Sequence, residues 1–377
     1  MWFLIVTLFP NIGPLGVLAG HSFSIVLYFF LFLKFKVKFP AYFKYLILGS
    51  LFFSSTIVLS QLANYDQLGF SLGQLKYSII PFYWIFGLLA GIVDAKIFGL
   101  KKTDSLFSFA AVFILAQIPL ILLQIMGFDS LLWISEKARD WTGILRVVGT
   151  VQNPNTLGIL TVLCIVVFAH FSKQKPLWSK VLIGLGALII LATGSRTSLI
   201  ILLFLPLLFV SKEALFSKKI VYTLLAVCLG LVLFYFVLLF LKDRLPYMSQ
   251  ILSLVEGQSV HTLSLRFSIW ENVGEIYQSA SIKNRLFGFG PGYFSVMDNS
   301  YFYVLFNYGV IGSVFFLFSL FILLVNLKVN NIEIARRSLY VLLICGLVAD
   351  VLLNFLFMTI IFYFIGLQTY SGFQKNA

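Results

Sequence analysis

The chain has 377 residues, of which 60% are hydrophobic and 17% aromatic, and only 11% carry a charge. Soluble domains carry about a quarter charged residues, so this composition excludes an ordinary soluble enzyme. The net charge of +13 would suit nucleic acid, but the basic residues recur in short segments at regular intervals, which is typical of membrane orientation, and we expect no nucleic-acid partner.

Continuous apolar segments recur along the chain, long enough to cross about 30 Å of hydrocarbon as helices. They lack the alternation of a membrane β-barrel, so the expected fold is all-α. The nine clearest segments are residues 14–33, 41–60, 77–98, 105–126, 154–171, 178–194, 197–211, 219–241 and 300–326. Residues 1–9 could add a short or tilted first helix. Residues 338–369 are too long for one straight helix and contain Asp350 and Asn354 near the middle, so we expect two short helices there. The sequence thus predicts a polytopic integral membrane protein of about twelve transmembrane helices, forming one domain over residues 1–377.

Basic residues divide unequally between alternate loops. One set of loops carries sixteen Lys and Arg against four acids, and the opposite set carries ten against nine. Loops rich in Lys and Arg stay on the cytoplasmic side, so we expect the first set to face the cytoplasm. Its members are Lys34, Lys36, Lys38, Lys44, Lys96, Lys101, Lys102, Lys173, Lys175, Lys180, Lys212, Lys218, Lys219, Lys328, Arg336 and Arg337, and its acids are Asp94, Asp104, Glu213 and Glu333. The expected location is the cytoplasmic (inner) membrane, with any active face extracytoplasmic.

Two outer loops are long enough to carry chemistry. The larger spans about residues 242–299, and a second spans about 127–153 and contains Trp133 and Trp141. All three cysteines fall in apolar segments, and the three histidines have no metal-ligand spacing. We therefore expect neither a disulfide nor a metal, and no cofactor.

Two polar clusters precede helices in the middle of the chain. In the first, Arg146 is followed by Asn153-Pro154-Asn155, in which Asn153 can cap a helix and Pro154 can occupy its first turn. The second places Arg196 in a tight, Gly-containing turn between two apolar segments. Arg196 could extend to the lipid headgroups, or it could be fixed against an anionic substrate, since a guanidinium binds phosphate oxygens in bidentate fashion.

The large loop contains a third cluster. Arg266 and Trp270 are four residues apart and share one face of a helix, with Glu271 beside them. A cation beside an aromatic ring suits phosphate and sugar together. The Gly-rich stretch Gly288-Phe289-Gly290 that follows is too irregular for a dinucleotide fingerprint and is interpreted as a flexible hinge.

A fourth cluster, Asp298-Asn299-Ser300-Tyr301, opens the helix expected over 300–326. Asp298 or Asn299 is a natural N-cap, and Asp298 could also act as a general base. These two roles are compatible. Asp350, flanked by apolar residues, is expected to be a structural hydrogen-bonding partner.

Taken in order, these clusters resemble the bacterial O-antigen polymerase/ligase superfamily of membrane glycosyltransferases. The resemblance covers about residues 146–312, and Gly309 is the last residue that carries it. It implies a GT-C-like helical fold with a large periplasmic or extracellular loop and a substrate of oligosaccharide linked to undecaprenyl diphosphate. It also implies that Arg196 and Arg266 hold the diphosphate, with Arg146 as a third member. Asn153, Asn155, Trp270, Glu271, Asn299 and Tyr301 are the further expected substrate contacts.

The family's ligases place a His ten intervening residues before a Gly at the start of the late helix. This chain has Asp298 there, with residues 299–308 before Gly309, and this difference favours a polymerase. Asp298 is then the first candidate for the base that activates the acceptor hydroxyl, with Glu271 and His261 in reserve. The product would be O-antigen, capsule or exopolysaccharide. Membrane lipid is an expected partner, and a chain-length regulator and a flippase remain open.

Two alternatives remain. A ligase would move finished polymer to another acceptor, and a transporter or flippase would carry the lipid-linked sugar. Transporters often show repeated halves and charged sites near the bilayer midplane. The sequence shows no repeat, and no Lys or Arg lies deep within a helix.

Overall fold

The computed structural model describes residues 1–8, 13–35, 43–68, 72–98, 104–126, 146–151, 153–209, 218–241, 261–294 and 297–373. Every regular element within these ranges is a helix. In chain order they are α1 (Trp2–Leu8), α2 (Gly13–Phe35), α3 (Phe43–Ala63), α4 (Tyr65–Leu68), α5 (Leu72–Ile97), α6 (Asp104–Ile125), the 3-10 helix η3 (Gly149–Val151), α7 (Pro154–His170), α8 (Pro176–Thr193), α9 (Arg196–Phe204), the 3-10 helix η4 (Leu205–Phe209), α11 (Lys218–Leu241), α13 (His261–Ser279), α14 (Ile282–Phe287), α15 (Ser300–Val329), α16 (Glu333–Cys345) and α17 (Phe355–Phe373).

The helix bounds confirm most of the predicted segments. The expected division of residues 338–369 is confirmed, because α16 ends at Cys345, α17 begins at Phe355, and Asp350 and Asn354 lie in the non-helical segment between them. The segment predicted over 197–211 is an α-helix only to Phe204 and then tightens into η4. Pro206 explains this change, because its ring removes a backbone N–H from the helical ladder.

Among the residues that the structure describes, five helices are long and apolar enough to cross a membrane: Phe43–Ala63, Tyr77–Ile97, Ser105–Ile125, Pro176–Thr193 and Ser300–Val329. Several of them expose large apolar side chains, as at Leu188 on α8 and Phe321 on α15. Apolar side chains facing outward suit contact with lipid. Of the two predicted outer loops, residues 127–145 and 242–260 lie outside the described residues. The remainder of the larger loop forms α13, α14 and the segment leading into α15.

The Cα positions group into two compact units. One comprises Met1–Ser24 and Leu106–His261, and the other comprises Ile25–Ser105 and Thr262–Ala377. In the first unit, α7 forms the centre: its residues from Leu157 to Phe168 are all buried, and it contacts α8, α9 and η3. A helix that is apolar on every side is suited to such a fully surrounded position.

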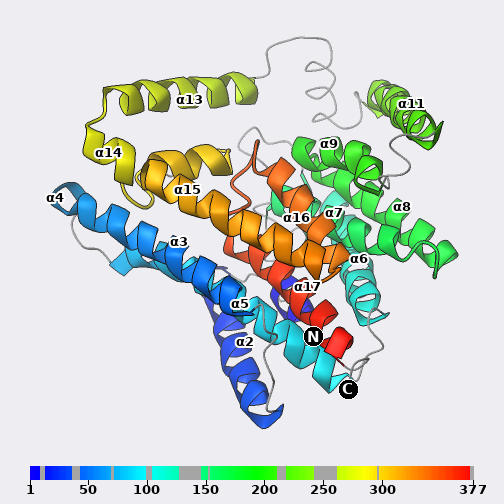
Figure 1. Cartoon of the computed structure of the whole chain (residues 1–377). Helices are drawn as coiled ribbons and strands as arrows, with labels where there is room; N and C mark the ends of the chain where they lie inside the picture. Colours follow the sequence, from blue (N-terminus) through cyan, green and yellow to red (C-terminus); the bar gives the residue numbers. More distant parts are fainter. Residues whose placement is uncertain are drawn as a thin grey trace. The chain divides into compact units, whose positions relative to one another are not determined.

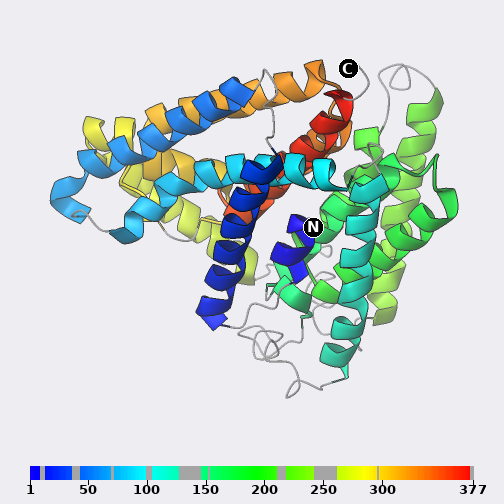
Figure 2. The same ribbon diagram turned by 90° about the horizontal axis from the view of Figure 1, so that it is seen from below.

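In the second unit, α5 and α17 lie side by side with their backbones in contact (Figures 1 and 2). A Cβ added at Gly87 would lie 2.3 Å from the carbonyl oxygen of Thr359, and one at Gly91 would lie 2.2 Å from that of Tyr363. Gly366 of α17 meets the carbonyl oxygen of Leu88 in the same way, at 2.2 Å. Small residues at these positions therefore allow the close helix approach that is common within membranes.

Asp94 links three helices of the second unit. Its carboxylate accepts hydrogen bonds from the hydroxyls of Tyr28 on α2 and Tyr363 on α17, each at 2.7 Å. Asp94 lies within α5 and is fully buried. Asp94, counted with a loop in the sequence analysis, thus lies in the last turn of α5, where two tyrosine hydroxyls allow its carboxylate to remain inside the helix packing.

Candidate functional site

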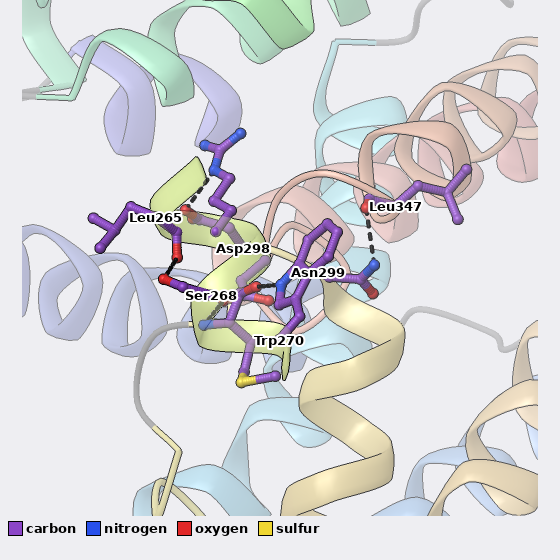
Figure 3. A network of polar contacts seen from close by, with 9 residues as sticks. Leu265, Ser268, Trp270, Asp298, Asn299 and Leu347 are labelled. Atoms are coloured by element: carbon purple, nitrogen blue, oxygen red, sulfur yellow. Dashed lines mark hydrogen bonds and ion pairs between the residues drawn. The ribbon is translucent and has the colours of Figure 1, made fainter. Parts of the chain in front are cut away.

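Arg266 and Trp270 both reach the segment that leads into α15. Arg266 Nε donates to Asp298 Oδ2 at 2.8 Å, and Trp270 Nε1 donates to the carbonyl oxygen of Met297 at 2.6 Å. Figure 3 shows Trp270 on α13 beside Asp298 and Asn299. The predicted common face of Arg266 and Trp270 is thus confirmed. About a third of each side chain in the Arg266–Asp298 pair stays exposed, at 31% and 39%, so a dissolved or membrane-borne anion can reach it.

Asn299 is the N-cap of α15. Its side-chain oxygen accepts from the backbone N–H groups of Tyr301 and Phe302, both at 3.0 Å, and its Nδ2 donates to the carbonyl oxygen of Leu347 at 2.9 Å. Asp298, the other predicted cap, instead takes a left-handed backbone conformation with φ 47° and pairs with Arg266. An Asp tolerates this conformation better than most residues. The two neighbouring polar residues therefore divide the capping and charge-binding roles.

Tyr301 is held by its hydroxyl, which donates to the carbonyl oxygen of Leu343 at 2.9 Å. Glu271 is exposed on α13. His261 begins α13, and its side chain lies outside the described residues. Tyr301 therefore has a structural contact of its own, and a role in substrate contact remains a prediction for Tyr301 and Glu271.

The Gly288-Phe289-Gly290 stretch docks into a break in α15. At Gly309 the helix is interrupted, with φ 69° and ψ −171°. The carbonyl oxygens of the two residues before Tyr308 accept hydrogen bonds from the glycine stretch. Phe289 N–H donates to the carbonyl oxygen of Phe306 and Gly290 N–H to that of Asn307, both at 3.0 Å. The interpretation of this stretch as a flexible hinge was therefore wrong, because its backbone is hydrogen bonded to the α15 break.

The backbone of the Gly288-Phe289-Gly290 stretch approaches the backbone of α15 most closely at two glycines. A Cβ on Gly288 would lie 2.3 Å from the carbonyl carbon and oxygen of Asn307, and a Cβ on Gly309 would lie 2.3 Å from the carbonyl oxygen of Leu286. Both glycines have positive φ, where side chains are strained. Only glycine fits both positions.

Helix α3 supports the same junction. Asn64 Nδ2 donates to the carbonyl oxygen of Gly288 at 2.9 Å, and Ser60 Oγ donates to that of Asn307 at 2.7 Å. The Asn307 side chain in turn accepts from the N–H of Phe294 at 3.1 Å. Sequence reasoning missed Ser60 and Asn64, although polar residues one turn apart near the end of an apolar helix are a signal for such a contact.

Asp350, between α16 and α17, contacts the segment that contains Asp298. Its Oδ2 accepts from the N–H of Met297 at 3.4 Å, which confirms the predicted structural hydrogen bond. Its Oδ1 is buried without a hydrogen-bond partner among the described residues. Burial raises the pKa of Asp350 to about 6, an increase that the negative charge of Asp298 reinforces and the N–H groups of residues 297–299 oppose.

A pocket of about 190 Å³ opens beside Asp350. Its wall includes three tyrosines, one phenylalanine, one carboxylate and one amide: Tyr77, Tyr303, Tyr308, Phe53, Asp350 and Asn354. These residues come from α3, α5, α15 and the segment before α17, all within the second unit. Sequence reasoning did not find the pocket, because its members are far apart along the chain.

Arg146 and its two asparagines lie together in the first unit. Arg146 Nε donates to the carbonyl oxygen of Thr193 at 3.1 Å, at the end of α8, and its Nη2 donates to Asn155 Oδ1 at 2.9 Å. Asn153 caps α7 by accepting from the N–H groups of Asn155 and Thr156. The predicted cap is confirmed, and Arg146 ties the end of α8 to the start of α7.

Arg196 is the first residue of α9, directly after a two-residue turn. Gly194 ends α8 in the left-handed conformation, with φ 60°, and Ser195 caps α9 by accepting from the N–H of Ser198. The predicted tight turn is confirmed. A Cβ on Gly158 of α7 would lie 3.0 Å from Ser195 Cβ, so the start of α9 contacts the first turns of α7. The N-terminal ends of α7 and α9, which carry the partial positive charge of the helix dipole, therefore lie close to Arg196.

The structure thus brings the predicted residues together in two groups. Arg266, Trp270, Asp298, Asn299 and Tyr301 surround the start of α15 in the second unit, whereas Arg146, Asn153, Asn155 and Arg196 belong to the first. Within the described residues, no three His, Cys, Asp or Glu side chains gather as metal ligands do.

Comparison with known proteins identifies no family for this chain. No family model matches the chain, and no curated protein matches it. Function is therefore inferred from the two groups of residues and from the all-helical fold that positions them.

Proposed function

We propose that this chain is a membrane glycosyltransferase that joins oligosaccharide repeats carried on undecaprenyl diphosphate. It would cross the cytoplasmic membrane about twelve times and act at the outer face, where residues 242–299 would lie. The observation that carries the proposal is the Arg266–Asp298 pair, held at the start of α15 beside Trp270.

Arg266 suits a diphosphate because one edge of its guanidinium is already positioned. Asp298 accepts from Nε, and within the described part of the chain the guanidinium makes no other hydrogen bond. The Nη groups can then donate to phosphate oxygens in the bidentate manner that guanidinium favours. Trp270 supplies an apolar surface next to that charge, partly exposed and packed edge-on against Phe267 and Phe302.

The chemistry requires charge stabilisation more than a strong acid. An acceptor hydroxyl attacks the anomeric carbon of the donor, the bond from that carbon to the diphosphate oxygen breaks, and the electron pair leaves with the diphosphate. Fixed guanidinium groups stabilise this developing negative charge in a site of low dielectric constant. Arg266 is the group proposed for this role in the second unit, and the role that the resemblance implies for Arg196, the first residue of α9 in the first unit, stays a prediction.

Arg146 has structural contacts of its own within the first unit. Its Nε and Nη2 already serve Thr193 and Asn155, so its primary role is to join α8 to α7. The position of Asp298, where the ligases of the resembling family have a His, favours transfer between two carrier-linked chains, and a polymerase is therefore proposed ahead of a ligase.

One observation favours the transporter as a second candidate. Helix α15 is broken at Gly309, and the segment between α16 and α17 holds a partly buried carboxylate beside a pocket. Discontinuous helices around a polar site are characteristic of secondary transporters. The test must therefore separate transport from polymerisation.

The test is the polysaccharide profile of a strain that lacks this gene, complemented with wild type, Arg266→Ala or Lys283→Ala. Lys283→Ala is the matched control, since it removes one positive charge from an exposed position on α14 of the same loop. We expect Arg266→Ala to give single repeats at the surface without a ladder, and Lys283→Ala to restore the ladder.

Other results would identify the alternatives. Long chains that accumulate on the lipid carrier would mean a ligase. Repeats confined to the cytoplasmic face would mean a transporter. A full ladder with Arg266→Ala would remove the basis for the diphosphate clamp.

A further inference from the structure

The pocket beside Asp350 is lined by aromatic and aliphatic side chains together with one carboxylate and one amide. Its volume of about 190 Å³ far exceeds the ~15 Å³ that one water molecule requires on this scale. The hydroxyl of Tyr303 lies within hydrogen-bonding reach of the hydroxyls of Tyr77 and Tyr308. Pockets that combine apolar walls with a few convergent polar groups are the usual form of small-ligand sites.

Asp350 is the one carboxylate among the described residues that line this pocket. Its Oδ2 accepts from the N–H of Met297 at 3.4 Å, and its Oδ1 is enclosed by protein atoms. The N–H groups of Asp298 and Asn299 also lie close to the carboxylate. A carboxylate oxygen has two lone pairs, so Oδ2 can accept from a hydroxyl group in the pocket as well as from Met297.

Asp350 is also close to the proposed diphosphate-binding group. Met297, whose N–H holds Asp350, precedes Asp298, whose carboxylate holds Arg266. The Asp350 carboxylate and the Arg266 guanidinium are thus held by neighbouring residues of one short segment, Met297 and Asp298.

We propose that this pocket binds the terminal sugar of the acceptor chain and that the Asp350 carboxylate accepts the proton of the hydroxyl that becomes glycosylated. This inference rests on the proposed function and names its acceptor subsite. As the new bond from the acceptor oxygen to the anomeric carbon forms, the hydroxyl proton moves to Asp350 and the carbon–oxygen bond to the diphosphate breaks. The proton is later released to water, and the diphosphate leaves with the bonding electron pair.

Asp350 replaces Asp298 as the base in this mechanism. Asp298 Oδ2 is bound by Arg266 Nε, so its carboxylate is a positioning group that orients the guanidinium. Within the described ranges, the titratable groups around Asp350 are Asp298 from the segment before α15, Tyr303 and Tyr308 from α15, and Tyr77 from α5, and none of them is a cation.

The experiment compares Asp350→Asn with Asp298→Asn. The full chain is purified into lipid nanodiscs and supplied with the lipid-linked repeat isolated from the strain that lacks this gene, and polymer formation is followed from pH 5 to pH 8. The amide that Asp350→Asn introduces can still accept from the N–H of Met297, so the thermal midpoint of this variant should equal that of wild type. The amide in Asp298→Asn can likewise still accept from Arg266 Nε.

We expect Asp350→Asn to lower the rate at least ~100-fold, the lower end of what a general base contributes. A base works only when unprotonated, so the wild-type rate should fall as the pH drops through about 6, the pKa of Asp350. Asp350→Asn should lack this acidic decline, and Asp298→Asn should retain it with a rate loss of less than ~10-fold.

A rate for Asp350→Asn within tenfold of wild type would overturn the inference, as would loss of the acidic decline in Asp298→Asn alone. If wild type itself forms no polymer from the repeat, the proposed function fails, and the acceptor subsite fails with it. The two failures are therefore distinguishable.

Discussion

Replacing Gly309 with alanine should destabilise the second unit, because the residue combines a positive φ with a backbone contact. Its φ of 69° and ψ of −171° lie in a region that is essentially restricted to glycine, and a side chain there costs about 1–3 kcal/mol. The added Cβ would also lie 2.3 Å from the carbonyl oxygen of Leu286 and 2.5 Å from the nitrogen of Gly288. Relieving this overlap requires movement of two backbones and costs about 1–3 kcal/mol more.

The expected loss of unfolding free energy in Gly309→Ala is therefore about 2–6 kcal/mol. For a unit of this size, 1 kcal/mol shifts the thermal midpoint by about 2–4 °C, so Gly309→Ala should lower the midpoint by at least ~4 °C. The assay is thermal unfolding of the purified protein in detergent. Gly274→Ala is the matched control, because Gly274 lies within α13 of the same unit with nothing within 4 Å of its added Cβ.

Gly274→Ala should leave the midpoint unchanged or raise it slightly, since alanine is favoured over glycine inside a helix by about 0.5–1 kcal/mol. Equal midpoints for Gly309→Ala and wild type would refute the reasoning. They would mean that the α14–α15 junction can rearrange without cost.

Three further substitutions test other contacts, each by the thermal midpoint of the purified protein. Asn299→Ala should cost about 1–2 kcal/mol because α15 loses its cap, whereas Asn299→Ser, which restores a capping oxygen, should recover most of it. Tyr363→Phe should cost about 1.5–3 kcal/mol by removing a hydroxyl from the buried carboxylate of Asp94, and an unchanged midpoint would show that this bond contributes nothing. Arg146→Ala should lower the midpoint, whereas Asn155→Ala, which removes only one of its bonds, should lower it less; the reverse order would contradict the assigned role of Arg146.

The elements that sequence reasoning predicted well are those with local causes. The apolar segments became helices close to their expected bounds, and the break around Asp350 and Asn354 appeared where two polar residues interrupt an apolar run. The cap at Asn153 and the shared face of Arg266 and Trp270 depend on residues at most a few positions apart. Periodicity and capping rules act over this range.

Features that depend on distant residues were not predictable in this way. The glycine stretch after α14 was taken as a hinge because its partner, the carbonyl groups beside the Gly309 break, lies about twenty residues further on. Asp94 was assigned to a loop because nothing near it in sequence indicates the tyrosines at positions 28 and 363 that bind it. The pocket beside Asp350 required four separate segments to be brought together.

The contacts of Asp94 also have a consequence for the order in which the protein assembles. Tyr28 precedes α5 along the chain, so its hydroxyl is present when Asp94 is synthesised, whereas Tyr363 follows 269 residues later. A newly made α5 therefore enters the membrane with one of these two hydroxyl donors available and gains the other only when α17 arrives against Gly87 and Gly91. Helix α17 thus supplies the later of these two hydrogen bonds to a carboxylate that is synthesised early, and a chain arrested before α17 would lack the hydrogen bond from Tyr363.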